Sequence, residues 1–404
     1  MKKNSLSKSE VQILKAIHSI ENPTRFSICQ AAQLSLIKVS SILNDLENRR
    51  FIGKKGKTKT KSGRPSIVYQ LNPDFCYSMG VVLELESFRI VGVDGAKNLM
   101  FDQTFKIELP ADGKLKIEEI TVQLCRRLKE SGARFIPNQN ALVAIGLAVP
   151  GMVDTDRGIW LLGLQVGGIK HINIAEIIQA EMGVPVFIED FARALAFLEK
   201  VNGLGKGIRD FILIELSIGM GTGIIINDQL YKGFHGLAGE IGHIAHENNN
   251  YRCSCGNVGC LETVISPSGL IKVVNDRLKE GVMSSLQKYI AEGENRLTLE
   301  AIFEEARNGD RLALSTLFET GQYLGDACVL LIKLFNPQRI IVSGYGSLFK
   351  DFISEPVKQS INRQVLPEML TDFEIVFSDY KPHHEAYGAG LLALSRYWEK
   401  SLTA

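Results

Sequence analysis

The sequence lacks any apolar run of about eighteen residues, the length expected of a membrane-spanning helix. Its first residues, Met1 to Ser5, carry two lysines but none of the apolar stretch that an export signal contains. A strong charge of one sign is also missing, because the formal net charge of the 404-residue chain is +1. The composition as a whole therefore implies no charge-driven partner, and we expect a cytoplasmic protein that does not insert into a membrane.

Cysteine is scarce and mostly scattered. Four of the 7 cysteines stand far apart, which is typical of reduced thiols rather than of a disulfide framework: Cys29, Cys76, Cys125 and Cys328. The other three, Cys253, Cys255 and Cys260, stand close together, and His243 lies upstream of them. Three thiolates and one imidazole form a closed tetrahedral set for structural zinc. The alternative is three ordinary thiols in a loop, but the spacing favours one zinc ion per chain.

The residues around these ligands form a long motif. Gly239-Glu240-Ile241-Gly242-His243 is followed by Cys-x-Cys-Gly-x-x-Gly-Cys-x-Glu, which ends at Glu262. This motif resembles the signature of the ROK family, which comprises bacterial sugar repressors and sugar kinases. A metal loop would hold the acceptors Glu240 and Glu262 in fixed positions, which suits a polyhydroxyl ligand. The resemblance implies an α/β protein with the actin-like (ribonuclease H-like), two-lobed sugar-kinase fold.

The N-terminal segment has the pattern of a helix-turn-helix. We expect helices over residues 6–20, 27–33 and 36–48, because apolar residues recur there at helical spacing. A break at Leu34-Ser35 separates the second helix from the third. The third helix would present polar side chains to a DNA groove, namely Lys38, Ser40, Ser41 and Asn44.

A basic segment follows these helices. Residues 53–65 carry six basic side chains and no acid, and the strand expected from Ser66 would pair with Phe51-Ile52. Such a run requires phosphates or solvent, and a solvated linker is the alternative. Because a helix-turn-helix precedes it, we predict a DNA-binding wing that contacts a double-stranded operator through Lys57, Lys59 and Lys61. Arg64, in Gly-Arg-Pro, resembles the arginine that ROK repressors place in the minor groove.

The remaining chain divides into two lobes. Three strands, a helix and a further strand up to Val149 match the opening order of a sugar-kinase lobe. We predict a winged helix-turn-helix domain over 1–72, a first lobe over 77–195 and a second lobe over 196–383. The helix expected over 384–400 would return to the first lobe, and the zinc loop would belong to the second.

Several residues match sugar contacts of the family. Pro150 and Gly151 lie in the loop that touches sugar, and Asp190 ends a short apolar strand. In the family this aspartate takes the proton from the sugar hydroxyl, and an asparagine precedes it where this chain has Glu189. Helix capping by Asp190 is a compatible alternative role. The predicted sugar-binding set is Pro150, Gly151, Glu189, Asp190, Glu240, His243 and Glu262.

The nucleotide-facing motifs of the kinases are degraded. Where the family has Asp-x-Gly-Gly-Thr, this chain has Glu84-Leu85-Glu86-Ser87-Phe88, which lacks glycine and adds carboxylates that would repel ATP. Ser217-Ile218 and Ser343 also depart from the pattern. We therefore predict a sugar sensor without catalytic residues, in which Asp190 is a vestigial base. The alternatives are a ROK sugar kinase with an added DNA-binding domain, and an interaction protein in which the metal is only a staple.

The family resemblance also implies partners. We expect a homodimer or homotetramer, in which a pair of reading heads would contact two half-sites. Sugar would favour one closure state of the lobes and so change DNA affinity, with repression relieved by sugar. Some ROK repressors respond instead to a sugar-transport protein, which remains an alternative partner.

Overall fold

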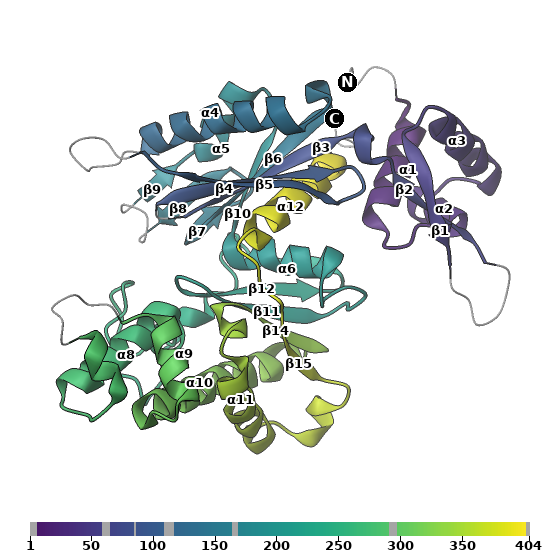
Figure 1. Ribbon diagram of the computed structural model, residues 1–404. Coiled ribbons are helices and arrows are strands. Elements are labelled where there is room, and N and C mark those ends of the chain that lie inside the picture. The colour runs from purple at the N-terminus through teal and green to yellow at the C-terminus, as the bar shows by residue number, and fades with distance from the viewer. Residues whose placement is uncertain are drawn as a thin grey trace. The chain divides into compact units, whose positions relative to one another are not determined.

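The computed structural model describes residues 6–58, 65–84, 86–108, 117–163, 169–290 and 297–400. The chain divides into two compact units (Figure 1). The first comprises Met1–Asp190 and His383–Ala404, and the second comprises Phe191–Pro382. Each unit buries its own hydrophobic clusters, so each is described by itself.

The first unit begins with three short helices and a two-stranded hairpin (Figure 1). These elements are α1 (Lys8–Ser19), α2 (Arg25–Ala32), α3 (Leu36–Asn48), β1 (Ile52–Lys57) and β2 (Ile67–Leu71). Ser7 and Glu10 form a capping box at the start of α1. The second helix begins two residues earlier than predicted, because Thr24 and Ser27 form a capping box of their own. The axes of α2 and α3 are bent by 111° at their junction, where the Ser35 side chain caps α3.

A five-stranded sheet forms the centre of the first unit. Its strand order is β10-β6-β3-β4-β5, with β3 parallel to β6 and antiparallel to β4. The strands are β3 (Tyr77–Leu83), β4 (Ser87–Asp94), β5 (Leu99–Lys106), β6 (Leu142–Val149) and β10 (Val186–Asp190). Helices α4 (Ile117–Phe135) and α5 (Ile174–Met182) contribute to the same buried cluster. A small sheet of β7 (Met152–Asp154), β8 (Ile159–Gly163) and β9 (Ile169–Ile172) was not predicted.

Helix α12 (His384–Lys400) returns to this sheet across a long sequence distance. Its backbone lies so close to the strands that a Cβ on Gly80 would stand 1.8 Å from the Ala386 carbonyl oxygen. A Cβ on Gly146 would stand 2.0 Å from the Ala389 carbonyl oxygen. The Ser78 hydroxyl donates to the Gly390 carbonyl oxygen at 2.8 Å. Glycine at both strand positions is what lets the helix reach the sheet.

The second unit is also built on a five-stranded sheet, in the order β13-β12-β11-β14-β15. Its strands are β11 (Phe211–Leu216), β12 (Met220–Ile226), β13 (Gln229–Tyr231), β14 (Arg339–Gly344) and β15 (Glu374–Phe377). The helices are α6 (Phe191–Asn202), α7 (Glu262–Ile265), α8 (Pro267–Lys279), α9 (Leu299–Arg307), α10 (Arg311–Phe335) and α11 (Lys350–Gln364). Helix α11 was not predicted from the sequence, and its buried residues belong to the largest cluster of this unit.

Among the described residues, no single helix combines the length and the apolar character needed to cross a membrane. Within that described part of the chain, one bent pair, α2 and α3, passes on length and composition when taken together, and the two helices meet at 111°.

Candidate functional site

The predicted metal ligands converge in the second unit. His243 ends a short 3-10 turn, η4 (Ile241–His243), and the three cysteines lie in the loop that leads to α7. The ligand atoms of His243, Cys253, Cys255 and Cys260 all lie within 4.8 Å of one another. The loop is tied back on itself by isolated β-bridges, Ala245 to Cys260 and Arg252 to Val258. The predicted set is therefore preassembled and could hold a metal ion.

The distances suit a tetrahedral ion of the size of zinc. The Cys255 and Cys260 sulfur atoms are 3.7 Å apart, and so are the Cys253 sulfur and His243 Nδ1. Zn–S bonds of about 2.3 Å place two sulfur atoms of a tetrahedron about 3.8 Å apart. Burial raises the pKa of the Cys260 thiol to about 12, whereas the Asn257 backbone N–H lowers the pKa of Cys255. A bound cation would hold all three sulfurs as thiolates at neutral pH.

A buried amide supports the metal loop. Asn249 is 4% exposed, and its Nδ2 donates to the Cys260 carbonyl oxygen at 2.8 Å and to the Thr263 hydroxyl at 2.9 Å. Its Oδ1 accepts the Tyr251 N–H at 3.0 Å. The amide thus uses both its N–H group and its carbonyl oxygen. The N–H group fixes the backbone at Cys260, and the oxygen fixes the chain just before Cys253. This role was not predictable, because Asn248, Asn249 and Asn250 form a polar run that resembles an ordinary loop.

The two glutamates of the motif stand beside the metal ligands. The Glu262 carboxylate accepts the Met220 N–H at 3.3 Å and lies 3.8 Å from the Cys253 sulfur. Glu240 lies 4.0 Å from the His243 ring and keeps 42% of its side chain exposed. Burial is the main cause that raises the pKa of Glu240, and His243 and Arg193 act in the opposite direction. Glu240 thus offers an accessible carboxyl next to the metal loop.

The other predicted sugar contacts belong to the first unit. Pro150 follows β6, and its carbonyl oxygen accepts the Trp160 indole N–H at 3.0 Å. Gly151 has a φ of +89°, and a Cβ there would stand 2.2 Å from the Leu162 carbonyl oxygen. Asp190 is the last residue of β10 and keeps partial exposure. The predicted sugar set is therefore divided between the two units.

Glu189 has a partner that was not predicted from the sequence. Its side chain is 2% exposed and pairs with Arg396 of α12, with 2.6 Å between the carboxylate and the guanidinium. The prediction treated Glu189 as a sugar contact, but this carboxylate is buried and bound within the first unit. A residue 207 positions away in the sequence cannot be identified as its partner from spacing alone.

The segments that replace the kinase phosphate loops are occupied by local contacts. Between β3 and β4, the Glu84 N–H donates to the Ser87 carbonyl oxygen at 2.9 Å, and the Ser87 hydroxyl donates to the Glu84 carboxylate at 2.5 Å. Leu85 lies outside the described residues. Ser217 is buried, and the buried Ser343 hydroxyl accepts from Ser378 at 2.8 Å.

The predicted DNA contacts lie on exposed parts of α3 and β1. Lys38, Ser41, Asn44 and Lys57 are exposed, and the Ser40 hydroxyl donates back to the Leu36 carbonyl oxygen at 2.7 Å. Ile37 is 85% exposed at the start of α3 and was not predicted as a contact. An exposed apolar residue at this position suits the methyl group of thymine. Lys59, Lys61 and Arg64 lie outside the described residues.

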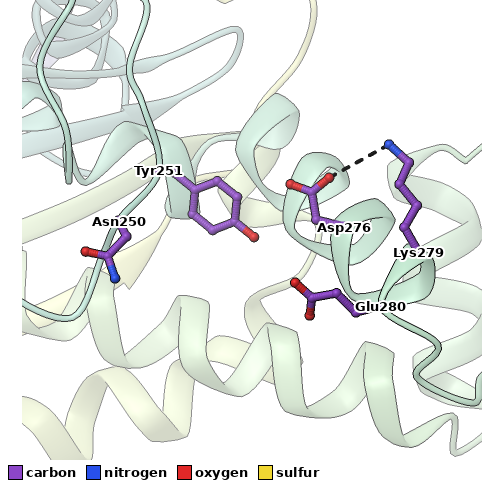
Figure 2. Close-up of a pocket in the computed structure, with 5 residues that line it drawn as sticks. All are labelled: Asn250, Tyr251, Asp276, Lys279 and Glu280. Atoms are coloured by element: carbon purple, nitrogen blue, oxygen red, sulfur yellow. Dashed lines mark ion pairs between the residues drawn. The ribbon is translucent and has the colours of Figure 1, made fainter.

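A polar hollow adjoins the metal loop. It has a volume of about 420 Å³ and is lined by Asn250, Tyr251, Asp276, Lys279 and Glu280. Figure 2 shows Tyr251 pointing from the loop toward α8, where Asp276 and Lys279 form an ion pair of 3.9 Å. A smaller cavity of about 180 Å³ shares Asn250 and Tyr251. Neither was predicted from the sequence, because their walls come from separate parts of the chain.

Two curated proteins match this chain over nearly its whole length. The xylose repressor of Caldicellulosiruptor bescii is 27% identical over 389 residues, which cover 96% of this chain and 95% of that protein. The DNA-binding transcriptional dual regulator NagC of Escherichia coli K12 is 29% identical over 380 residues, with coverages of 91% and 87%.

Two crystal structures share the fold. A ROK family transcriptional regulator, a homologue of the E. coli MLC protein, superimposes with a TM-score of 0.80 and 25% identity and covers 98% of each chain. A ROK family glucokinase of Streptomyces griseus, in complex with glucose and AMPPNP, superimposes with a TM-score of 0.65 and 25% identity. The match covers 78% of this chain and 99% of the glucokinase chain.

These likenesses confirm the predicted two-lobed sugar-kinase fold. The model of the ROK family matches residues 96–396, which is most of the chain and includes the metal loop. On this match and on the motif that surrounds the metal ligands, the protein belongs to the ROK family.

Proposed function

We propose that the protein is a sugar-responsive, DNA-binding transcriptional regulator, and more specifically a repressor of carbohydrate metabolism genes. One observation carries the proposal. The similar repressors and the MLC homologue match nearly the full chain, whereas the glucokinase matches 78% of it. The chain therefore has a portion without a counterpart in that enzyme, as expected for a kinase scaffold to which a DNA-reading head has been added.

The geometry of the head supports DNA binding. Helices α2 and α3 meet at 111°, a crossing within the range of helix-turn-helix motifs. The outer surface of α3 exposes Lys38, Ser41 and Asn44, and the β1–β2 hairpin follows as a wing. We assign α3 to the major groove, and Lys57, Lys59, Lys61 and Arg64 to phosphates and the minor groove.

The effector in this proposal is a sugar. Asp190, Glu240 and Glu262 supply carboxylate acceptors for its hydroxyls, while Pro150, Gly151 and His243 complete the set. Asp190 accepts a hydrogen bond from a sugar hydroxyl. In a sensor, no phosphoryl group is offered to that sugar oxygen, so Asp190 does not act as a catalytic base. The contacts of Glu84 and Ser87 with each other support a sensor rather than a kinase, because the sequence between β3 and β4 contains no glycine-rich cradle for phosphate.

We further propose that the metal is one structural zinc ion per chain. Its four ligands leave no open position for a substrate or a water, so its role is to hold Glu240 and Glu262 in place. A homodimer would supply two reading heads for two half-sites, and a homotetramer would supply two such pairs. Sugar binding then lowers DNA affinity. The size of the decrease is set by the difference between the sugar affinity of the DNA-binding state and that of the other state.

The proposal is tested by a thermal-shift screen of hexoses, pentoses and N-acetyl sugars, with and without ATP. A sugar should raise the midpoint temperature of unfolding, because a ligand stabilises the folded state that binds it. ATP should add nothing, because the sequence between β3 and β4 contains no glycine-rich cradle for phosphate. The same sugars should give no ADP release in a coupled kinase assay. Sugar-dependent ADP release that disappears in Asp190→Asn would favour the alternative, a ROK kinase with an added DNA-binding domain.

A further inference from the structure

A buried charge pair joins the last turns of α12 to β10. Arg396 donates through Nη2 to the Glu189 carboxylate at 2.6 Å and through Nη1 to the Ile188 carbonyl oxygen at 3.3 Å. The Arg396 side chain is 12% exposed, and that of Glu189 is 2% exposed. Because a buried charge is costly without a partner, neither residue can release the other without penalty.

This pair holds the end of the strand that carries Asp190. Ile188 and Glu189 are the two residues before Asp190 in β10, so both contacts of Arg396 act directly on the strand end. The Glu189 carboxylate also accepts the Asp190 N–H at 3.4 Å. The position that is asparagine in the family pattern is therefore a carboxylate with its own arginine.

The same helix turns reach the DNA-reading head on another side. Leu394 and Trp398 are buried in the cluster formed by α1, α2, α3 and the β1–β2 hairpin. The Trp398 ring stacks on Phe75 with 5.9 Å between centroids, and Phe75 lies 4.7 Å from Phe51, which joins α3 to β1. Residues two apart on a helix point in different directions, so Arg396 and Trp398 contact different neighbours from one turn. Figure 1 shows α12 lying along the sheet and ending near α1.

We propose that Glu189 and Arg396 are positioning residues that couple sugar binding at Asp190 to the DNA-reading head through the end of α12. The inference rests on the proposed function and adds the connection within it. A hydrogen bond from the sugar to Asp190 shifts the end of β10. Arg396 moves with it, because it is hydrogen-bonded to two residues of that strand. Trp398 then changes its packing on Phe75.

The test is a thermodynamic cycle on the full-length protein. DNA affinity is measured by fluorescence anisotropy, without sugar and at saturating concentration of the effector sugar, for the parent, Glu189→Asn, Arg396→Met and the double variant. Sugar affinity is measured separately by calorimetry. For the parent we expect sugar to weaken DNA binding by about tenfold or more. For the double variant we expect the DNA affinity without sugar and the sugar affinity each to stay within about threefold of the parent. The effect of sugar on DNA affinity should fall below about threefold.

A matched control separates coupling from general stability. Arg126→Gln on α4 removes an ion pair with Glu108, which follows β5 in the same unit. The two side chains are 49% and 63% exposed, so this change should leave the sugar effect unchanged. If the double variant does not fold, Arg396→Lys keeps the charge but not the two-pronged grip, and it should reduce the sugar effect in the same direction. A sugar effect that equals that of the parent in these variants, or a complete loss of sugar binding in the double variant, overturns the coupling. A parent protein that binds no DNA or no sugar would instead refute the proposed function.

Discussion

The four predicted metal ligands are the residues whose proposed role follows most directly from their chemistry. Cys255 is exposed and lies 3.7 Å from the Cys260 sulfur. We expect Cys255→Ser to abolish stoichiometric zinc and to lower the free energy of unfolding by roughly 3 kcal/mol, since loss of a metal is among the few changes with large effects. Sugar binding should weaken too, because the same loop orders Glu240 and Glu262. Elemental analysis and thermal unfolding provide the measurement.

Cys29→Ser is the matched control for this prediction. Cys29 is a partly exposed cysteine in α2, remote in sequence from the metal loop, and its replacement should leave the zinc content unchanged. The zinc assignment is wrong if the parent protein, purified without chelator, carries no stoichiometric zinc.

Asp190 provides a second test at the scale of single residues. Asp190→Asn preserves size but replaces an acceptor-only carboxylate with an amide, so the fold should persist while sugar affinity falls by about tenfold. ATP turnover should be absent in both proteins. Asp228→Asn, at a side chain that is 58% exposed, serves as the control and should bind sugar like the parent. Unchanged sugar affinity in Asp190→Asn would remove this residue from the site.

Residue chemistry was predictable where it is local in sequence. The spacing of His243, Cys253, Cys255 and Cys260 sufficed to predict their convergence. The partner of Glu189 could not be predicted, because the pair joins β10 to α12 and depends on the packing of the whole unit. The exposure of Ile37 was also missed, since an apolar residue at the start of a helix is usually assigned to the core.

At the scale of elements, the contact between α12 and the sheet gives a stability prediction. Gly146→Ala would place a methyl group 2.0 Å from the Ala389 carbonyl oxygen, and that oxygen belongs to backbone, which cannot move aside as a flexible side chain would. We expect a decrease of about 3 kcal/mol or more in the free energy of unfolding. Gly132→Ala in α4 is the control, because its nearest neighbour would be Met79 at 3.9 Å. That variant should be neutral or more stable by up to about 1 kcal/mol, and equal effects in both would contradict the packing.

The basic wing gives a prediction about DNA binding. Replacing Lys57, Lys59 and Lys61 by alanine should weaken binding to all duplexes. The salt dependence should also flatten, by about 0.9 in slope for each phosphate that a lysine no longer neutralises. Changes at Ser41 or Asn44 should instead alter the preferred base sequence. Anisotropy titrations at several salt concentrations measure both effects. If the triple variant binds DNA like the parent at moderate salt, the lysines do not contact phosphate.

Elements were predictable to the extent that their pattern is local. The break before α3 was predicted directly from the sequence, and Ser35 caps the helix there. The β7-β8-β9 sheet was not, because its strands are only 3 to 5 residues long and lack a clear alternation. Helix α11 was missed as well, and it contains Pro356, which argues against a helix interior.

At the scale of the whole molecule, we interpret the protein as a sugar-kinase fold adapted to sense rather than to phosphorylate. The ROK glucokinase of Streptomyces griseus shares the fold over 78% of this chain. In our proposal, the difference from a kinase lies in the turn between β3 and β4 and in the added head, and neither changes the fold that both share. The fold alone therefore does not decide between enzyme and regulator, and the local chemistry does.

The central claim is that sugar occupancy controls DNA affinity. The most direct measurement uses the full-length protein with fragmented genomic DNA from its source, followed by titration of the recovered duplex in the presence of each sugar in turn. We predict that one duplex is enriched and bound at least about 1,000-fold more tightly than random DNA, and that one sugar lowers this affinity by about tenfold or more. Binding no tighter than to random DNA, or an affinity that no sugar changes, would contradict it.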